Sequence, residues 1–275
     1  MNRIARFPVL AAATMILLTT MSGCKKLEAR DQLNKGVEAF KAAQYEDAIN
    51  HFQKAVDLDP TYPETRTYLA TAYASEVVPD LKTPQNEKTA QMAINIFKQV
   101  LEQTPNDVNS LAQIANLYMD LDEFDKAKAW NQKVLQADPK NSQAAYTIGV
   151  IDWRIAYKNS QGALKTANLT DDGKGNPKMP KQVCQEIKQQ NTDIVNEGMT
   201  YLNEALQIDP TYDNAMSYLN LMYRQKANLD CGDESARKQD VQTADQWAAK
   251  ALTTRRQNEE KKAKVARGIV IQEGK

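Results

Sequence analysis

Histidine, glycine and the aromatic residues are scarce in this sequence of 275 residues. It contains one histidine, ten glycines, five phenylalanines and three tryptophans. No Cys/His cluster has zinc-binding spacing, and no glycine-rich loop of the kind that holds phosphate is present. Lysine plus arginine and aspartate plus glutamate number 35 each, so no net charge draws nucleic acid to the chain. The sequence therefore predicts a protein that is not an enzyme, with no cofactor, no metal ion and no nucleic-acid partner.

Residues 1–23 have the pattern of a signal peptide. Arg3 and Arg6 precede a mostly apolar run over 7–20, which is too short for a transmembrane helix of about 20 residues but suits a signal-peptide core. The run ends in Met-Ser-Gly before Cys24, which is similar to the lipobox of bacterial lipoproteins, although leucine is more usual where Met stands. The alternative is an ordinary cleaved signal followed by a chance cysteine.

The lipobox resemblance implies an address in the cell envelope. The peptidase would cut before Cys24, and the cysteine would then carry lipid that anchors the chain to a membrane, facing the periplasm. Lys25 follows the cysteine instead of aspartate, which by resemblance to enterobacterial sorting favours the outer membrane over the inner one.

One short pattern recurs along the rest of the chain. In the stretch 45–60, small or apolar residues at Ala48, Phe52 and Ala55 share one face of a helix, and Asp59-Pro60 ends that helix. The pattern returns before Pro105, Pro139 and Pro210, and a weaker copy contains Ala244, Ala248 and Ala251.

The spacing of the copies predicts a repeat protein. The closing prolines are 45, 34 and 71 residues apart, and about 34 residues is the period of tetratricopeptide (TPR) repeats. The longer gaps correspond to one period plus an insertion. The chain therefore resembles a TPR protein, with departures at Asn131, where Phe is expected, at Gly198, where Ala is expected, and at Asp152, where Tyr is expected.

This resemblance implies an all-α fold, a right-handed superhelix or solenoid of about five helix-turn-helix repeats. We expect a short linker at 24–28 and a charged capping helix or tail at 257–275. Insertions are expected between the two helices of repeats two, four and five, over 77–86, 158–180 and 226–234. The expected repeats are 29–62, 63–107, 108–141, 142–212 and 213–256.

Two further cysteines remain once Cys24 is assigned to the lipid. Cys184 and Cys231 form an even pair in an oxidising compartment. In the repeat register both stand at the turn between the two helices of consecutive repeats, on the same edge of the solenoid. The sequence favours a Cys184–Cys231 disulfide, and two independent thiols are the alternative.

The TPR resemblance also implies a concave groove lined by the first helix of each repeat. Tyr, Trp and Arg in such positions are types enriched at interface hot spots, and Asn can bond an extended peptide backbone. Alternatively, the insertion at 158–180 packs over Trp153 and covers the groove. The residues expected to line it are Asn109, Asn116, Met119, Tyr146, Val150, Trp153, Arg154, Leu221 and Arg224.

The function that these features predict is a membrane-anchored periplasmic adaptor that binds a protein or an extended peptide. Its plan is similar to that of lipoproteins of outer-membrane β-barrel assembly and of type IV pilus secretin assembly. The alternative is a regulatory or carrier subunit of a cell-envelope enzyme that binds a peptide or a glycan.

Overall fold

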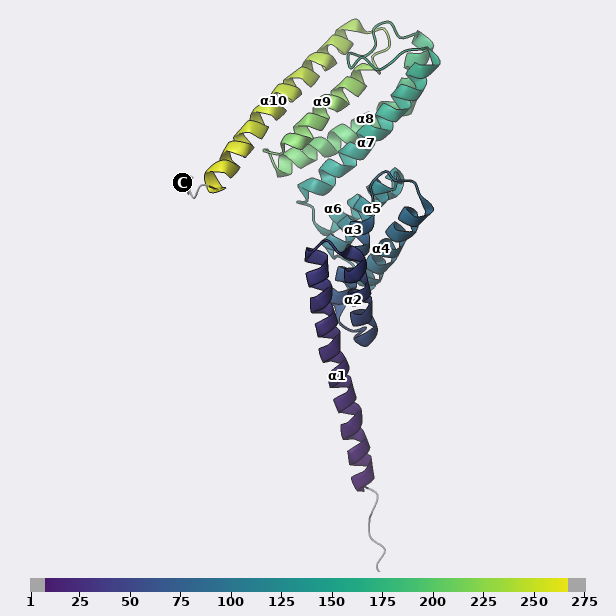
Figure 1. Ribbon diagram of the computed structural model, residues 1–275. Helices are drawn as coiled ribbons and strands as arrows, with labels where there is room; N and C mark the ends of the chain where they lie inside the picture. Colours follow the sequence, from purple (N-terminus) through teal and green to yellow (C-terminus); the bar gives the residue numbers. More distant parts are fainter. Residues whose placement is uncertain (1–7, 267–275) are drawn as a thin grey trace, which may run out of the picture. The chain divides into compact units, whose positions relative to one another are not determined.

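The computed structural model describes residues 8–266, with side chains for 24–62 and 64–265. Within this range the chain forms ten α-helices and no strand (Figure 1). The expectation of an all-α fold of paired helices is therefore confirmed. The helices are α1 (Pro8–Lys41), α2 (Tyr45–Leu58), α3 (Pro63–Glu76), α4 (Pro84–Gln103), α5 (Val108–Asp120), α6 (Phe124–Ala137), α7 (Ser142–Thr166), α8 (Lys181–Ile208), α9 (Asp213–Ala227) and α10 (Glu234–Ala266).

Local sequence signals set most helix ends. The helices α2, α6 and α8 each end directly before an Asp-Pro pair, because the residue before proline is pushed out of the helical region. At the other end, the side chain of Asp107 accepts a hydrogen bond from Ser110 N at 2.9 Å, and Asn141 accepts one from Ala144 N at 3.0 Å. Such caps satisfy amide groups that have no partner inside the helix.

The chain divides into two compact units. The first unit extends to Glu123 and the second begins at Phe124. This boundary lies between α5 and α6, and therefore inside the expected repeat at 108–141.

Small residues let the helices of the first unit approach one another. In this unit α1 packs on α2, α3 on α4, and α2 on α3. Phe52 is fully buried in the core, and its ring occupies the place of a side chain at Gly36, where a Cβ would lie 2.5 Å from ring atoms. The phenylalanine of the repeat pattern thus fills the space that a glycine leaves open.

The second unit has an equally close contact between α7 and α8. A Cβ at Gly149 would lie 2.5 Å from Leu202 Cγ, and a Cβ at Gly198 would lie 2.8 Å from Asp152 Cβ. Glycine stands at position 198, where the repeat pattern has Ala, because a Cβ there would lie too close to Asp152. The helices α9 and α10 form the next pair and lie side by side (Figure 1), and α7 also packs on α9.

Three element boundaries differ from the sequence expectation. The helix α7 was expected to end near Tyr157 but continues to Thr166, because Ser160, Ala163 and Leu164 are buried on one side of it. The first insertion is shorter than expected, since α4 already begins at Pro84. Residues 24–28, expected as a linker, are helical within α1. None of the helices in the described part of the chain is long and apolar enough to cross a membrane.

Candidate functional site

Five aromatic side chains gather where α7 and α9 meet, and we call this surface the aromatic face. Trp153 stacks on Tyr157 with ring centroids 5.3 Å apart, and Tyr218 meets the Trp153 ring edge-on at 5.3 Å. Tyr146 lies 5.5 Å from Tyr218 and 4.9 Å from Tyr212. The α7 members are seven and four residues apart, which places them on one side of the helix. All five rings are half-buried, so each packs into the unit and also reaches its surface.

Two phenol groups of this face, those of Tyr146 and Tyr212, have raised pKa values. Burial, with the nearby carboxylates of Asp209 and Asp213, raises the pKa of Tyr212 to about 12. Burial also raises the pKa of Tyr146, and the neighbouring Tyr218 and Tyr212 add to this shift. The Tyr212 hydroxyl donates a hydrogen bond to the side-chain oxygen of Gln143. The phenols of Tyr146 and Tyr212 are therefore uncharged at neutral pH.

The residues expected to line the groove fall into both units. Asn109 and Asn116 are exposed on α5 of the first unit, and Met119 is half-buried there. Tyr146 and Trp153 belong to the aromatic face, and Leu221 is half-buried on α9. Tyr157, Tyr212 and Tyr218 were not among the expected residues. The spacing of Tyr157 from Tyr146 and Trp153 along α7 is the signal that could have identified it.

Val150 is buried, and both arginines contact other residues of the second unit. Val150 is only 7% exposed, so it packs inside the second unit instead of offering surface. The guanidinium of Arg154 lies 4.9 Å from the centre of the Phe124 ring. Arg224 is held by Asp245 at 2.7 Å, by Asn220 at 3.0 Å and by the Gly173 carbonyl at 2.8 Å. Arg224 therefore fastens the fourth repeat's insertion to α9 and α10.

That insertion, residues 167–180, is a turn held by its own side chains. The Asp172 carboxylate accepts hydrogen bonds from Lys174 N at 2.8 Å and Asn176 N at 3.0 Å. Outside the loop its bonds go to the end of α9 and to α10, including Gln225 to Asp171 at 2.9 Å. The nearest ring neighbours of Trp153 are Tyr157 and Tyr218. The side-chain hydrogen bonds that the insertion makes outside itself thus go to residues 224–237.

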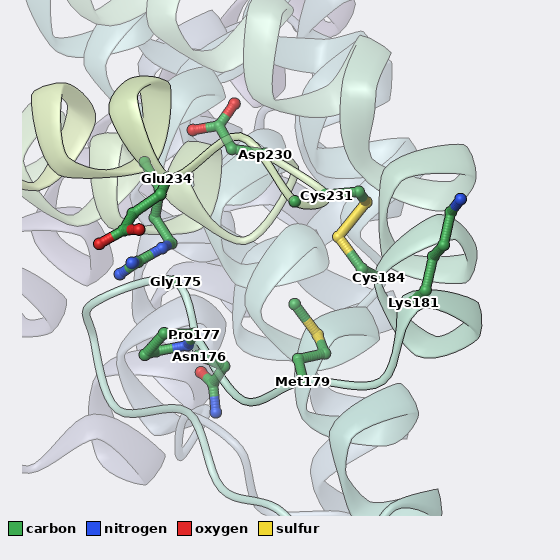
Figure 2. A pocket seen from close by; sticks show the side chains of 11 residues that line it. Gly175, Asn176, Pro177, Met179, Lys181, Cys184, Asp230, Cys231 and Glu234 are labelled. Atoms are coloured by element: carbon green, nitrogen blue, oxygen red, sulfur yellow. A yellow bond between two sulfur atoms is a disulfide. The ribbon is translucent and has the colours of Figure 1, made fainter.

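A disulfide joins the start of α8 to the loop between α9 and α10 in the second unit. The Sγ atoms of Cys184, at the start of α8, and Cys231, in the α9–α10 loop, are bonded, which is the pairing that the sequence favours. A hollow of about 530 Å³ lies beside the bond (Figure 2). Lys181 and Arg237 line it together with Asp230 and Glu234, so its charge selects neither an anion nor a cation.

One buried cluster of charged side chains was not expected from the sequence. The side chain of Asp152, on α7, is 1% exposed. Lys128 Nζ of α6 lies 2.8 Å from Asp152 Oδ1 and 2.7 Å from Glu197 Oε2 of α8. Burial raises the pKa of Asp152 to about 6, although Lys128 opposes the shift. The one sign of this cluster in the sequence was that Asp152 stands where the repeat pattern has Tyr.

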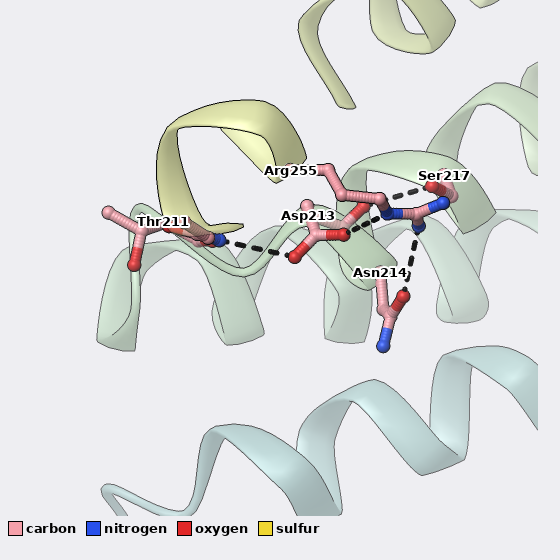
Figure 3. A network of polar contacts seen from close by, with 6 residues as sticks. Thr211, Asp213, Asn214, Ser217 and Arg255 are labelled. Atoms are coloured by element: carbon pink, nitrogen blue, oxygen red, sulfur yellow. Dashed lines mark hydrogen bonds and ion pairs between the residues drawn. The ribbon is translucent and has the colours of Figure 1, made fainter. Parts of the chain in front are cut away.

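Polar contacts tie the last helix to the start of α9. Arg255 Nε lies 2.7 Å from Asp213 Oδ2, and Arg255 Nη2 donates to Asn214 at 3.2 Å (Figure 3). Asn258 donates to the Thr211 carbonyl at 2.9 Å. The helix α10 is therefore fastened up to Asn258, just past the expected end of the repeats at residue 256. Among the described side chains, no group of three His, Cys, Asp or Glu could hold a metal ion.

Comparisons with known proteins agree with the repeat pattern. The family described as "Tetratricopeptide repeat" matches residues 87–149, and the one described as "TPR repeat" matches residues 38–76. The chain is 28% identical over 139 residues to sperm-associated antigen 1 of Rattus norvegicus. This match covers 50% of the chain and 14% of that protein's length.

Solved structures of MamA proteins are similar in fold. The MamA RS-1 ArsTM double mutant gives a TM-score of 0.56 at 15% identity, covering 85% of this chain and 97% of that one. MamA residues 41 to the end from Desulfovibrio magneticus RS-1 give 0.54 at 16% identity, with coverage of 84% and 96%. At this level of identity the likeness concerns the fold alone.

Proposed function

Because TPR repeats are recognised in this chain and its fold is that of TPR proteins, we propose that it is a periplasmic adaptor anchored to a membrane by lipid on Cys24. In this proposal the aromatic face binds an extended segment of a partner protein. The chain catalyses no reaction, and its role is to hold the partner close to the membrane. The outer membrane is the favoured location.

The observation that supports this proposal is the aromatic face itself. Large aromatic side chains lose little conformational freedom on binding, and they dominate the energetics of interfaces. Here the rings already hold one another in place by stacked and edge-on contacts. A partner would therefore meet a surface whose side chains are ordered before binding, which lowers the entropic cost of the complex.

Arg154 and Arg224 argue against one specific kind of ligand. A clamp for the carboxylate of a peptide C-terminus needs free cations, but Arg224 is engaged by Asp245 and by the insertion, and Arg154 lies against Phe124. The proposed partner segment is therefore recognised through its apolar and aromatic side chains.

The test is capture of partners from detergent-solubilised envelopes with the wild-type chain and with Trp153→Ala. We expect the partner to be lost with Trp153→Ala, and to be weakened less by Arg154→Ala. The matched control is Trp247→Ala, which removes a half-buried tryptophan of α10 next to Lys250, outside the aromatic face. A partner that is retained by Trp153→Ala but lost with Trp247→Ala would contradict the proposed site.

The identity of the captured proteins separates the two functional hypotheses. Subunits of barrel or secretin assembly would support the adaptor. Peptidoglycan enzymes would instead favour the regulatory subunit of a cell-envelope enzyme.

A further inference from the structure

Cys24 is connected to the first repeat by a continuous helix and not by a loop. Residues 24–28 are helical and continue directly into the segment that packs on α2. Ala29 is buried, and Leu33 is buried one turn later. In a chain that begins at Cys24, only this one exposed helical turn would therefore lie between the lipid and the packed part of α1, and it is too short to act as a long flexible linker.

The first turn of this segment presents an apolar side chain next to the cysteine. Leu27 is 71% exposed, and Cys24 is also exposed. Three residues apart, they lie on the same side of the helix. Lys25, Lys26 and Arg30 are exposed around them. An exposed leucine with lysines beside it is the arrangement expected where a helix end meets the headgroup region of a bilayer.

The α2–α3 turn lies at the same end of the first unit. The pKa of the Asp59 carboxyl in this turn is lowered, because Thr61 donates a hydrogen bond to it and because Lys26 and Arg30 are close enough to act on it. Arg66, in the first turn of α3, donates to the Pro60 carbonyl at 2.6 Å. This turn and the start of α1 therefore form one end of the unit.

We propose that this end of the first unit lies directly on the phospholipid surface, with Leu27 in the headgroup region beside the lipid on Cys24. The inference rests on the lipid anchor of the proposed function and adds an orientation to it. At a rise of 1.5 Å per residue, α1 carries the chain about 25 Å from Cys24 to Lys41. The opposite end of the unit, with the α1–α2 and α3–α4 connections, is thus held away from the membrane.

Site-specific quenching tests this orientation in the full lipidated chain. The native cysteines are occupied by lipid or by the disulfide, so one introduced cysteine takes a fluorophore selectively. Glu64→Cys places it near the proposed lipid contact, and Lys41→Cys places it at the far end of α1. In phosphatidylethanolamine–phosphatidylglycerol vesicles that contain a headgroup-nitroxide lipid, we expect several-fold stronger quenching at position 64 than at position 41.

Two altered chains serve as controls for the same labels. A flexible Gly–Ser insertion between Lys26 and Leu27 releases the helix from its anchor, and we expect it to abolish the difference between the two labels. Leu27→Ser keeps the lipid and the helix but removes the apolar side chain, and we expect a smaller difference.

The outcomes separate the orientation from the anchor. Equal quenching at both positions in a chain that floats with the vesicles would overturn the orientation and leave the lipid anchor intact. A chain that carries no lipid and does not float would overturn both proposals. A difference that survives the Gly–Ser insertion would show that the continuous helix does not set the orientation, which also contradicts the inference.

Discussion

Asp152 is a carboxyl group buried where repeat proteins of this kind usually place a tyrosine. Its Oδ1 atom is paired with Lys128, whereas its Oδ2 atom is buried without a hydrogen-bond partner. Glu197, on the other side of Lys128, adds a second negative charge. Burial and this charge favour the protonated acid over the carboxylate, which is why the pKa of Asp152 is raised to about 6.

We therefore predict that the second unit loses stability as the pH rises from 3.8 to about 6. In this window the folded state binds the proton of Asp152 more tightly than the unfolded state does. The contribution is complete below 3.8 and disappears as the pH passes about 6, with a size on the order of 3 kcal/mol. All three tryptophans, Trp130, Trp153 and Trp247, lie in the second unit, so fluorescence during urea unfolding measures its stability.

The variant Asp152→Asn should show a weaker pH dependence across this window. The dependence should not vanish, because burial and Asp240 raise the pKa of Asp230 to about 6 and so act in the same direction. The matched control is Asp193→Asn, an exposed position of α8, which should keep the wild-type slope. If Asp152→Asn and the wild type had the same slope, the carboxyl would not be titrating as the structure indicates.

Replacing either of two glycines by alanine should change the unfolding free energy of the second unit, and the two changes should have opposite signs. At Gly198 a Cβ would lie 2.8 Å from Asp152 Cβ, so Gly198→Ala must push α7 and α8 apart, at a cost of about 1–3 kcal/mol. At Gly162, exposed on α7, a Cβ would meet nothing within 4 Å. Gly162→Ala should raise the unfolding free energy by about 0.5–1 kcal/mol, because alanine loses less backbone entropy in a helix. Urea unfolding followed by tryptophan fluorescence compares them, and a stable Gly198→Ala would contradict the close packing.

The limits of sequence reasoning are clear at individual residues. Tyr146 and Trp153 could be identified because the repeat register places them on a first helix. The burial of Val150 and the pairing of Arg224 could not, because both depend on how neighbouring helices and an insertion fold around them. An insertion has no register, so its partners do not follow from the spacing of the repeats.

At the scale of elements, Arg224 links a helix to an insertion. It donates to the Gly173 carbonyl, while Arg237 donates to the neighbouring Lys174 carbonyl at 3.1 Å. Arg224→Ala should therefore loosen the loop at 167–180. The loss of a charge-assisted hydrogen bond of about 1.5 kcal/mol should raise the fraction of molecules in which the loop is open by roughly tenfold. Trypsin cleavage after Lys174 and Lys178 measures this opening.

The control for this experiment is Arg154→Ala, which removes the same side chain from α7. It should leave cleavage after Lys174 and Lys178 unchanged, because the guanidinium of Arg154 packs on the ring of Phe124 in α6. If trypsin cleaved the loop at the same rate in the wild type and in Arg224→Ala, the insertion would be held by other contacts.

The disulfide should stabilise the second unit through its unfolded state. Cys184 and Cys231 are 47 residues apart, and closing a loop of this length contributes up to about 4 kcal/mol. Reductant should lower the urea midpoint of the tryptophan transition. The double variant Cys184→Ala, Cys231→Ala should begin at the lower midpoint and show no response to reductant. A reductant-insensitive wild type would mean that the two thiols are not joined in solution.

Helix ends that depend on packing were the least predictable elements. Asp-Pro pairs ended α2, α6 and α8 as expected, because that signal is local. The extension of α7 was missed, because residues 158–166 contain polar and small residues typical of a loop. The buried Ser160, Ala163 and Leu164 recur at helical spacing, but three small or apolar residues among polar ones are a weak signal.

At the scale of the molecule, the repeat period predicted a series of helix pairs, and it could not predict the boundary at Glu123. Every repeat has the same pattern, so the pattern does not indicate where one compact unit ends and the next begins. The boundary lies inside a repeat that carries no insertion, so an insertion does not mark the unit boundary in this chain.

Anchoring is also a property of the whole molecule, and one substitution tests it. Several acyl chains on one cysteine hold a protein to a bilayer, at about 0.8 kcal/mol per buried methylene. Cys24→Ser should therefore abolish incorporation of labelled palmitate and move the chain from the membrane pellet to the soluble fraction.

The fold should survive this change, because the Cys24 side chain is exposed. The matched control is Lys25→Ser, which should keep both palmitate and the membrane location. If the wild type takes up no palmitate and is soluble, residues 1–23 act as an ordinary signal peptide, and the contact of Leu27 with the bilayer loses its basis. If Cys24→Ser stays in the pellet without lipid, the chain is held at the membrane by something other than lipid on this cysteine, either an uncut segment 1–23 or a bound partner.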